Sequence, residues 1–122
     1  MISLVMSIYN GEKFIIEQLQ SIKNQTLKID EVILVDDCST DKTIEMVKHY
    51  IDNNQLTWKL YINKKNLGWK ANFYQGIQIA SGDIIFLSDQ DDIWELNKVE
   101  IMSNKMIDNP NIELLQSNYE II

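Results

Sequence analysis

The chain is poor in the residues that cross-link small proteins or build zinc sites. Its 122 residues include one cysteine, Cys38, and one histidine, His49. A lone cysteine forms no disulfide within the chain, and one cysteine with one histidine cannot supply the usual ligand set of a zinc site. Any metal ion must therefore be held by oxygen ligands.

Long apolar runs and an export signal are also missing. No stretch approaches the ~20 apolar residues needed to cross a bilayer. The first residues, 1–5, lack the basic leader and small-residue cleavage site of a signal peptide. We therefore expect a chain that begins inside its fold, has no membrane span and is cytoplasmic, with a full-length protein peripheral to a membrane as an open alternative.

Two glycine-rich phosphate-binding motifs are absent. Residues 9–12 read Y-N-G-E rather than G-x-G-x-x-G, and no G-x-x-x-x-G-K-[ST] occurs anywhere. Rossmann-type NAD enzymes and P-loop ATPases are therefore disfavoured. The net charge of −7 and the scattered basic residues also argue against a nucleic-acid partner. A phosphorylated small molecule remains compatible with this charge, because a bound divalent ion inverts the local field.

Short apolar runs alternate with segments of helical periodicity along a chain of one domain's length. The runs predict strands over 2–8, 31–35, 56–62, 83–87 and 112–115. The intervening helices are expected to have core faces that include Ile15, Leu19 and Ile22, then Ile44, Val47 and Ile51, then Phe73, Ile77 and Ala80, then Leu96, Val99, Met102 and Met106. Ser39 or Thr40 is expected to cap the second helix.

Strands that are apolar throughout, rather than at every second residue, indicate burial on both faces. With helical connections, they predict an α/β fold with a mostly parallel sheet and helices on both faces, as in Rossmann-like proteins. Such sheets bind ligands beyond the carboxyl ends of their strands, where the strand order reverses. We expect one domain over residues 1–122, with its ligand site at that edge.

Acidic residues gather where two of the predicted strands end. Asp36 and Asp37 follow the second strand, and Asp89-Gln90-Asp91-Asp92 follows the fourth. Carboxylates this crowded repel each other by roughly 1 kcal/mol per pair in water, and more where they are partly desolvated, so a cation is expected among them. The alternatives are a solvated loop at Asp89–Asp92 that caps the next helix, and a turn with a helix cap at Asp36-Asp37.

Four stretches resemble the nucleotide-sugar-binding half of family 2 glycosyltransferases, the inverting group with the GT-A fold. They are V-M-S-I-Y-N-G-E at 5–12, I-L-V-D-D-C-S-T-D at 33–41, N-L-G at 66–68, and A-S-G-D leading into S-D-Q-D-D-I-W at 80–94. The S-D-Q-D-D-x-W variant further resembles a subset that includes rhamnosyltransferase-like proteins.

The resemblance implies a role for each matching residue. Ser7 and Tyr9 would border the base, and Asp36 and Asp37 would accept hydrogen bonds from its ring. Asp89-Gln90-Asp91 matches the D-x-D motif that holds Mg²⁺ or Mn²⁺ against a diphosphate. Phe73 stands near the place of the family's arginine after N-x-G, which leaves Lys70 as the nearest cation for a phosphate. The nucleotide-binding candidates are Ser7, Tyr9, Asn10, Glu12, Asp36, Asp37, Asn66, Lys70 and Asp89, and the metal ligands are Asp89 and Asp91.

The implied activity is transfer of a sugar from a UDP- or dTDP-sugar, with inversion, to an acceptor hydroxyl in bacterial cell-surface polysaccharide synthesis. The chain would be the donor half of a longer enzyme, whose catalytic base and site for a saccharide or lipid-linked acceptor lie beyond Ile122. Apolar residues at 114–122 favour self-association of such a piece. Two alternatives stay open: a non-catalytic nucleotide-binding module, and a receiver-type phosphorylation-switch domain.

Overall fold

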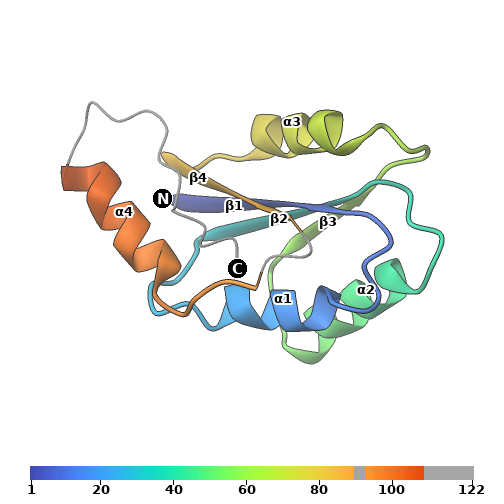
Figure 1. Cartoon of the computed structure of the whole chain (residues 1–122), viewed down its shortest axis with the longest axis horizontal. Helices are drawn as coiled ribbons and strands as arrows, with labels where there is room; N and C mark the ends of the chain where they lie inside the picture. Colours follow the sequence, from blue (N-terminus) through green and yellow to red (C-terminus); the bar gives the residue numbers. More distant parts are fainter. Residues whose placement is uncertain (90–92, 109–122) are drawn as a thin grey trace, which may run out of the picture.

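The computed structural model of the chain describes residues 1–89 and 93–108. These residues form a four-stranded parallel sheet with helices on both faces (Figure 1). The strands are β1 (Ile2–Ile8), β2 (Glu31–Asp36), β3 (Lys59–Ile62) and β4 (Ile84–Asp89). The helices are α1 (Ile15–Lys23), α2 (Thr43–Asn53), α3 (Trp69–Ile79) and α4 (Lys98–Asp108). The expected α/β fold is confirmed.

The strand order is β3-β2-β1-β4, so the chain reverses its progress across the sheet after β3. Helices α1 and α2 lie on one face, and α3 lies on the other (Figure 1). This follows from the right-handedness of parallel crossovers, since reversing the winding direction moves the connecting helix to the opposite face. The reversal falls between β1 and β4, and this is the position where open α/β sheets bind ligands.

The two central strands carry the core. β1 and β2 are buried over nearly their whole length, as the uninterrupted apolar pattern predicts. In β1, Leu4, Met6 and Ile8 join the core on the side of α1 and α2, whereas Val5 packs on the side of α3. The strands β3 and β4 are more exposed than this pattern predicts, because each is an edge of the described sheet.

Helix α3 packs very closely against the sheet at Gly76. A Cβ atom added there would lie 2.2 Å from Cγ1 of Val5, so only glycine fits without a shift. Gly76 and Asn72 are the buried residues of this helix. The expectation that Ile77 faces the core is wrong: Ile77 is 37% exposed, because it lies about 100° round the helix from Gly76.

Several predicted boundaries differ from the observed ones. Helix α2 begins at Thr43 and has no side-chain cap from Ser39 or Thr40, because Ser39 bonds Asp36 instead. The third strand begins at Lys59 rather than at residue 56. The fourth strand continues to Asp89, and α4 begins at Lys98 rather than near Leu96. The strand predicted over 112–115 lies outside the described residues.

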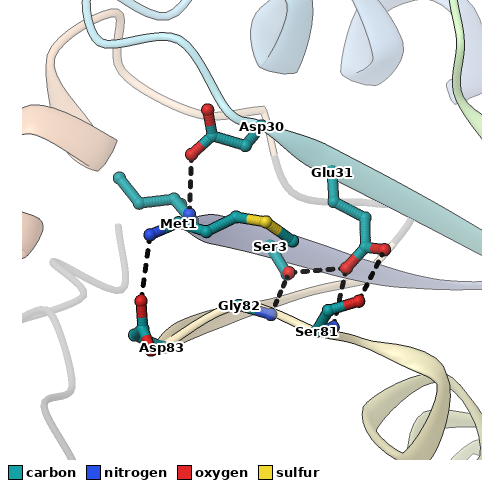
Figure 2. Close-up of polar contacts among 8 residues, drawn as sticks. Met1, Ser3, Asp30, Glu31, Ser81, Gly82 and Asp83 are labelled. Atoms are coloured by element: carbon teal, nitrogen blue, oxygen red, sulfur yellow. Dashed lines mark hydrogen bonds and ion pairs between the residues drawn. The ribbon is translucent and has the colours of Figure 1, made fainter.

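A polar cluster closes the amino-terminal edge of the sheet (Figure 2). The Glu31 carboxylate accepts hydrogen bonds from the Ser3 hydroxyl at 2.7 Å and from the Ser81 N–H at 2.9 Å. The Ser3 oxygen also accepts the Gly82 N–H at 2.9 Å. The cluster joins the turn before β4 to β1 and β2. None of the helices described in residues 1–89 and 93–108 has the length and apolar character needed to cross a bilayer.

Candidate functional site

Two of the predicted site residues are neighbours at the switch point of the sheet. Ser7 of β1 and Asp89 of β4 are register partners on adjacent parallel strands. Strand alternation points both side chains toward the face covered by α3, which Val5 also faces. Ser7 is 6% exposed, whereas Asp89 is exposed at the strand end. Of the two side chains, Asp89 is therefore the one that solvent reaches.

A fully buried amide, Asn72 of α3, links Ser7 to the second strand. Its Nδ2 donates to the Ser7 Oγ at 2.8 Å and to the Val35 carbonyl at 2.7 Å. Its Oδ1 accepts a hydrogen bond of 2.7 Å from Nδ2 of Asn63, in the loop after β3. Asn72 therefore joins three elements at their site-facing ends.

The Asp37 carboxylate organises the loop before α3. It accepts the N–H groups of Leu67 at 2.7 Å and of Gly68 at 2.9 Å, and Nδ2 of Asn63 at 3.0 Å. Asp37 is only 2% exposed, and these donors offset the desolvation of its charge. The φ of +92° at Gly68 suits glycine, and Asn66 donates to the Asp37 carbonyl at 3.3 Å. The predicted residues Asp37 and Asn66 therefore lie together.

The Asp36 carboxylate also accepts hydrogen bonds from within the protein. It accepts the Ser39 N–H at 2.8 Å and the Ser39 hydroxyl at 2.6 Å, and it is 1% exposed. Between them, Cys38 has a φ of +65°. The turn proposed as the alternative for Asp36 is thus present, and contact of Asp36 or Asp37 with a base stays a prediction.

The loops after β1 and β2 are tied to each other by Asn10 and Glu12. The Asn10 N–H donates to the Ser39 Oγ at 2.9 Å, and the Asn10 Oδ1 accepts the Thr40 N–H at 2.8 Å. The Glu12 N–H donates to Asp41 at 3.3 Å. With φ of +46°, Asn10 adopts a conformation that asparagine tolerates better than most residues. Both residues shape the rim of the site, and their contact with a nucleotide stays a prediction.

Asp41 is held ionised at this loop junction. Burial acts to raise its pKa, but hydrogen bonds from the Thr43 hydroxyl and from the N–H groups of Thr43 and Glu12 prevail, so the pKa lies below its ordinary value. The Thr43 hydroxyl is in turn the acceptor of the buried Gly11 N–H at 2.8 Å. The start of α2 is therefore fixed against the loop after β1.

Tyr9 and Lys70 lie at the same edge but differ in their surroundings. Tyr9 follows β1 and is 43% exposed, and its stacking on a base stays a prediction. Lys70 lies in the first turn of α3, with its ammonium 5.4 Å from the ring centroid of Trp69. The contacts described for the chain do not join Lys70 to the other predicted site residues.

Of the acidic cluster, Asp89 lies within the described structure, as the last residue of β4. Asp91 and Asp92 lie outside the described residues. Over residues 1–89 and 93–108, no group of three or more His, Cys, Asp or Glu side chains could hold a metal ion. Asp89 fits Mg²⁺ or Mn²⁺ by its hard oxygen donors and its position at the switch point, and further ligands would be needed.

The sequence interpretation missed several amides and a hydroxyl that hold neighbouring elements together. They are the buried Gln18, Ser21 and Gln25 of α1 and the following turn, the buried Asn72 of α3, and the half-buried Asn63 after β3. A signal was present for Gln18, because it occupies a position within the apolar stripe of Ile15, Leu19 and Ile22. A polar residue in such a stripe indicates a buried partner.

Comparisons with known proteins agree with this architecture. The family described as Glycosyl transferase family 2 matches residues 3–121. A curated relative from Escherichia coli, named UDP-Glc:alpha-D-GlcNAc-diphosphoundecaprenol beta-1,3-glucosyltransferase WfgD, is 34% identical over 122 residues, which are 100% of this chain and 47% of the relative. The chain spans about half the length of the curated relatives it matches first.

Two solved structures share the fold. TarS 1-349 of S. aureus, in complex with UDP-GlcNAc, has a TM-score of 0.76 at 26% identity, covering 98% of this chain and 38% of TarS 1-349. The mannosyltransferase PcManGT of Pyrobaculum calidifontis, in complex with GDP-Man and Mn²⁺, has a TM-score of 0.81 at 24% identity, covering 91% of this chain and 33% of PcManGT, and supports the fold alone. The expected GT-A fold is confirmed, and the rhamnosyltransferase-like subset stays a prediction. The chain belongs to glycosyl transferase family 2.

Proposed function

We propose that this chain is the donor-binding half of an inverting glycosyltransferase that uses a nucleoside-diphosphate sugar. The nucleotide is a uridine or deoxythymidine diphosphate, and the product is a cell-surface polysaccharide. Family membership supports the reaction class, and the UDP-GlcNAc bound to TarS supports the uridine nucleotide.

The observation that carries the proposal is the pairing of Ser7 with Asp89 at the switch point of the sheet. The loop built on Asp37 lies on the same side, and the loops joined by Asn10 and Ser39 form the adjoining rim. A nucleotide lying across the ends of β2, β1 and β4 would have its base near Tyr9 and Asn66 and its diphosphate near Asp89.

A divalent ion completes the proposed site. Asp89 and Asp91 would hold Mg²⁺ or Mn²⁺, which when bound neutralises negative charge on the departing diphosphate. The exposed position of Asp89 at the end of β4 is compatible with contact to an ion bound from solution. The residues of this half position the donor, and the catalytic base belongs to the acceptor half.

The acceptor would be a saccharide or a lipid-linked saccharide held by that further half. The length of the relatives leaves room for it, and the name of WfgD specifies an undecaprenol-linked acceptor for that protein. The full-length protein would work in the cytoplasm, beside the membrane if its acceptor is lipid-linked. Sugar transfer by the full-length protein would distinguish an enzyme from a non-catalytic nucleotide-binding module.

Calorimetric titration of the chain with UDP and dTDP, with and without Mn²⁺, tests the proposal. We expect Mn²⁺ to strengthen nucleotide binding, and Asp89→Asn to abolish the strengthening by removing a charged ligand. Asp52→Asn, on the exposed surface of α2, is the matched control for the lost charge. The proposal fails if neither nucleotide binds in the presence of Mn²⁺, or if both variants behave alike.

A further inference from the structure

Three polar side chains form one buried stripe on α1 and the turn that follows it. They are Gln18, Ser21 and Gln25, at helical positions i, i+3 and i+7, and they are 0%, 8% and 8% exposed. Each contacts the chain beside the D-x-D motif. We name this set the α1 amide stripe.

Gln18 holds the chain on the amino-terminal side of the motif. Its Nε2 donates to the main-chain carbonyl of Asp89 and to the Ser88 Oγ, the latter at 2.5 Å. The carbonyl belongs to the last residue of β4, so this contact restrains the main chain of Asp89. The backbone atoms that carry the Asp89 side chain are thereby held in place.

Ser21 and Gln25 hold the chain on the carboxyl-terminal side. The Ser21 Oγ accepts the Trp94 N–H at 3.1 Å, and Gln25 Nε2 donates to the Glu95 carbonyl at 2.7 Å. Gln25 Oε1 also accepts the Val99 N–H at 2.9 Å, just inside α4. Side chains of α1 and of the turn that follows it therefore hold the described chain on both sides of residues 90–92.

One polar atom of Gln18 is buried without a hydrogen-bond partner among residues 1–89 and 93–108. This atom is Oε1, and its desolvation offsets part of what the two donated bonds of Gln18 contribute. Methionine has a similar length and would fill the same space without an unpaired polar atom. The amide is therefore better explained by its contact with Asp89 than by packing.

We propose that the α1 amide stripe positions Asp89 for the divalent ion and the diphosphate. Gln18 is a positioning residue, since it acts through the main chain of Asp89 and does not touch the ligand. This inference rests on the proposed function and adds to it the element that orients the metal-binding strand end. On this inference, α1 affects the strengthening of nucleotide binding by the metal ion, and it does not affect nucleotide binding without the ion.

The test compares Gln18→Met and Gln25→Met with Gln20→Met, a matched control on the exposed face of the same helix. The readout is the ratio of the UDP dissociation constants without and with Mn²⁺, measured by calorimetry. We expect this ratio to fall about 10-fold in Q18M and Q25M, the usual effect of removing a group that orients a metal ligand. The metal-free constant and the Q20M ratio should stay unchanged. Thermal melts check that each variant is folded at the temperature of the titration, because Q18M leaves the buried Ser88 hydroxyl without its Gln18 donor.

The outcomes separate positioning from general support of the fold. An unchanged ratio in Q18M and Q25M, or equal weakening of metal-free and metal-dependent binding, would overturn the inference while leaving the proposed function intact. A wild-type chain that binds UDP without any response to Mn²⁺ would overturn the proposed metal site and this inference together. If one variant unfolds, the other decides the question.

Discussion

At the scale of single residues, Asn72 of α3 joins β1, β2 and the loop after β3 at the carboxyl edge of the sheet. Replacing it by alanine would leave the Ser7 Oγ, the Val35 carbonyl and the Asn63 amide without this partner in a buried region. We expect Asn72→Ala to lower the free energy of unfolding by about 3 kcal/mol, since each unsatisfied buried polar group costs about 1–3 kcal/mol. Urea denaturation measures the change.

The control for this substitution is Asn104→Ala, on the exposed surface of α4, which should change stability by less than about 0.5 kcal/mol. Similar values for N72A and N104A would show that the amide network contributes little. Such a result would also remove Asn72 as the link between Ser7 and the loop built on Asp37.

Gly76 gives a second prediction for a single residue. Gly76→Ala should destabilise the chain by about 1–3 kcal/mol, because the added methyl group collides with Val5 across the interface between α3 and the sheet. Val5→Ala frees that space, so the double variant should lose less stability than the sum of the two single variants. Strict additivity in a double-mutant cycle by urea denaturation would contradict the contact.

Single-residue roles were the hardest to predict from the sequence. The acidic residues stood out by their crowding, but Asp36 and Asp37 proved to be buried acceptors that hold loops. Gln18 and Asn72 carry no motif, and each bonds a residue more than 60 positions away in the chain, Ser88 and Ser7 respectively. Only the fold brings such pairs together, so sequence alone could mark these amides as unusual without naming what they bind.

At the scale of elements, the polar cluster in Figure 2 makes stability depend on pH. Hydrogen bonds from the Ser81 N–H and the Ser3 hydroxyl lower the pKa of Glu31 from its ordinary value of 4.5, against the opposing effect of burial. A pKa that is lower in the folded state adds stability above pH 4.5, and this stability is lost as the pH falls through the folded-state value.

Glu31→Gln should therefore melt at a lower temperature than the wild type at pH 7. The gap should close as the pH falls below 4.5, because the wild type then loses the same charged interaction. Thermal melts followed by circular dichroism between pH 7 and pH 3 measure both curves, with Glu45→Gln on the exposed face of α2 as the control for charge. A gap that stays constant over this range would contradict the role of Glu31.

The kinds and order of the elements followed from the sequence, whereas several boundaries did not. The apolar periodicity identified β1, β2 and all four helices of the described chain. The start of α2 was misjudged because the Ser39 side chain can serve either a helix or the Asp36 carboxylate, and local sequence does not decide between them. The start of β3 was misjudged because the apolar run begins before the strand does. Leu56 and Trp58 precede β3 and pack against the core from the loop.

At the scale of the whole molecule, the predicted α/β fold, with helices on both faces of a parallel sheet, and the family are confirmed. Strand order was not predictable from periodicity, because it depends on which face each connecting helix covers. The observed order β3-β2-β1-β4 puts the reversal beside Asp89. The first residue of the acidic motif therefore lies at the position where open α/β sheets bind ligands. Strand β4 is an edge of the sheet formed by the described residues. The chain spans about half the length of the curated relatives it matches first.

The most direct test of the account is to locate the bound ion by paramagnetic broadening of amide signals in an isotopically labelled chain with UDP. Substoichiometric Mn²⁺ should broaden the amide signal of Asp89 and those of its neighbours Ser7 and Ser88 strongly. The signals of Ser3 and Gly82, at the opposite edge of the sheet, should broaden least, with Mg²⁺ as the diamagnetic control. Strongest broadening at Ser3 and Gly82, or no UDP-dependent broadening at all, would contradict a metal-assisted nucleotide site at the carboxyl ends of β1 and β4.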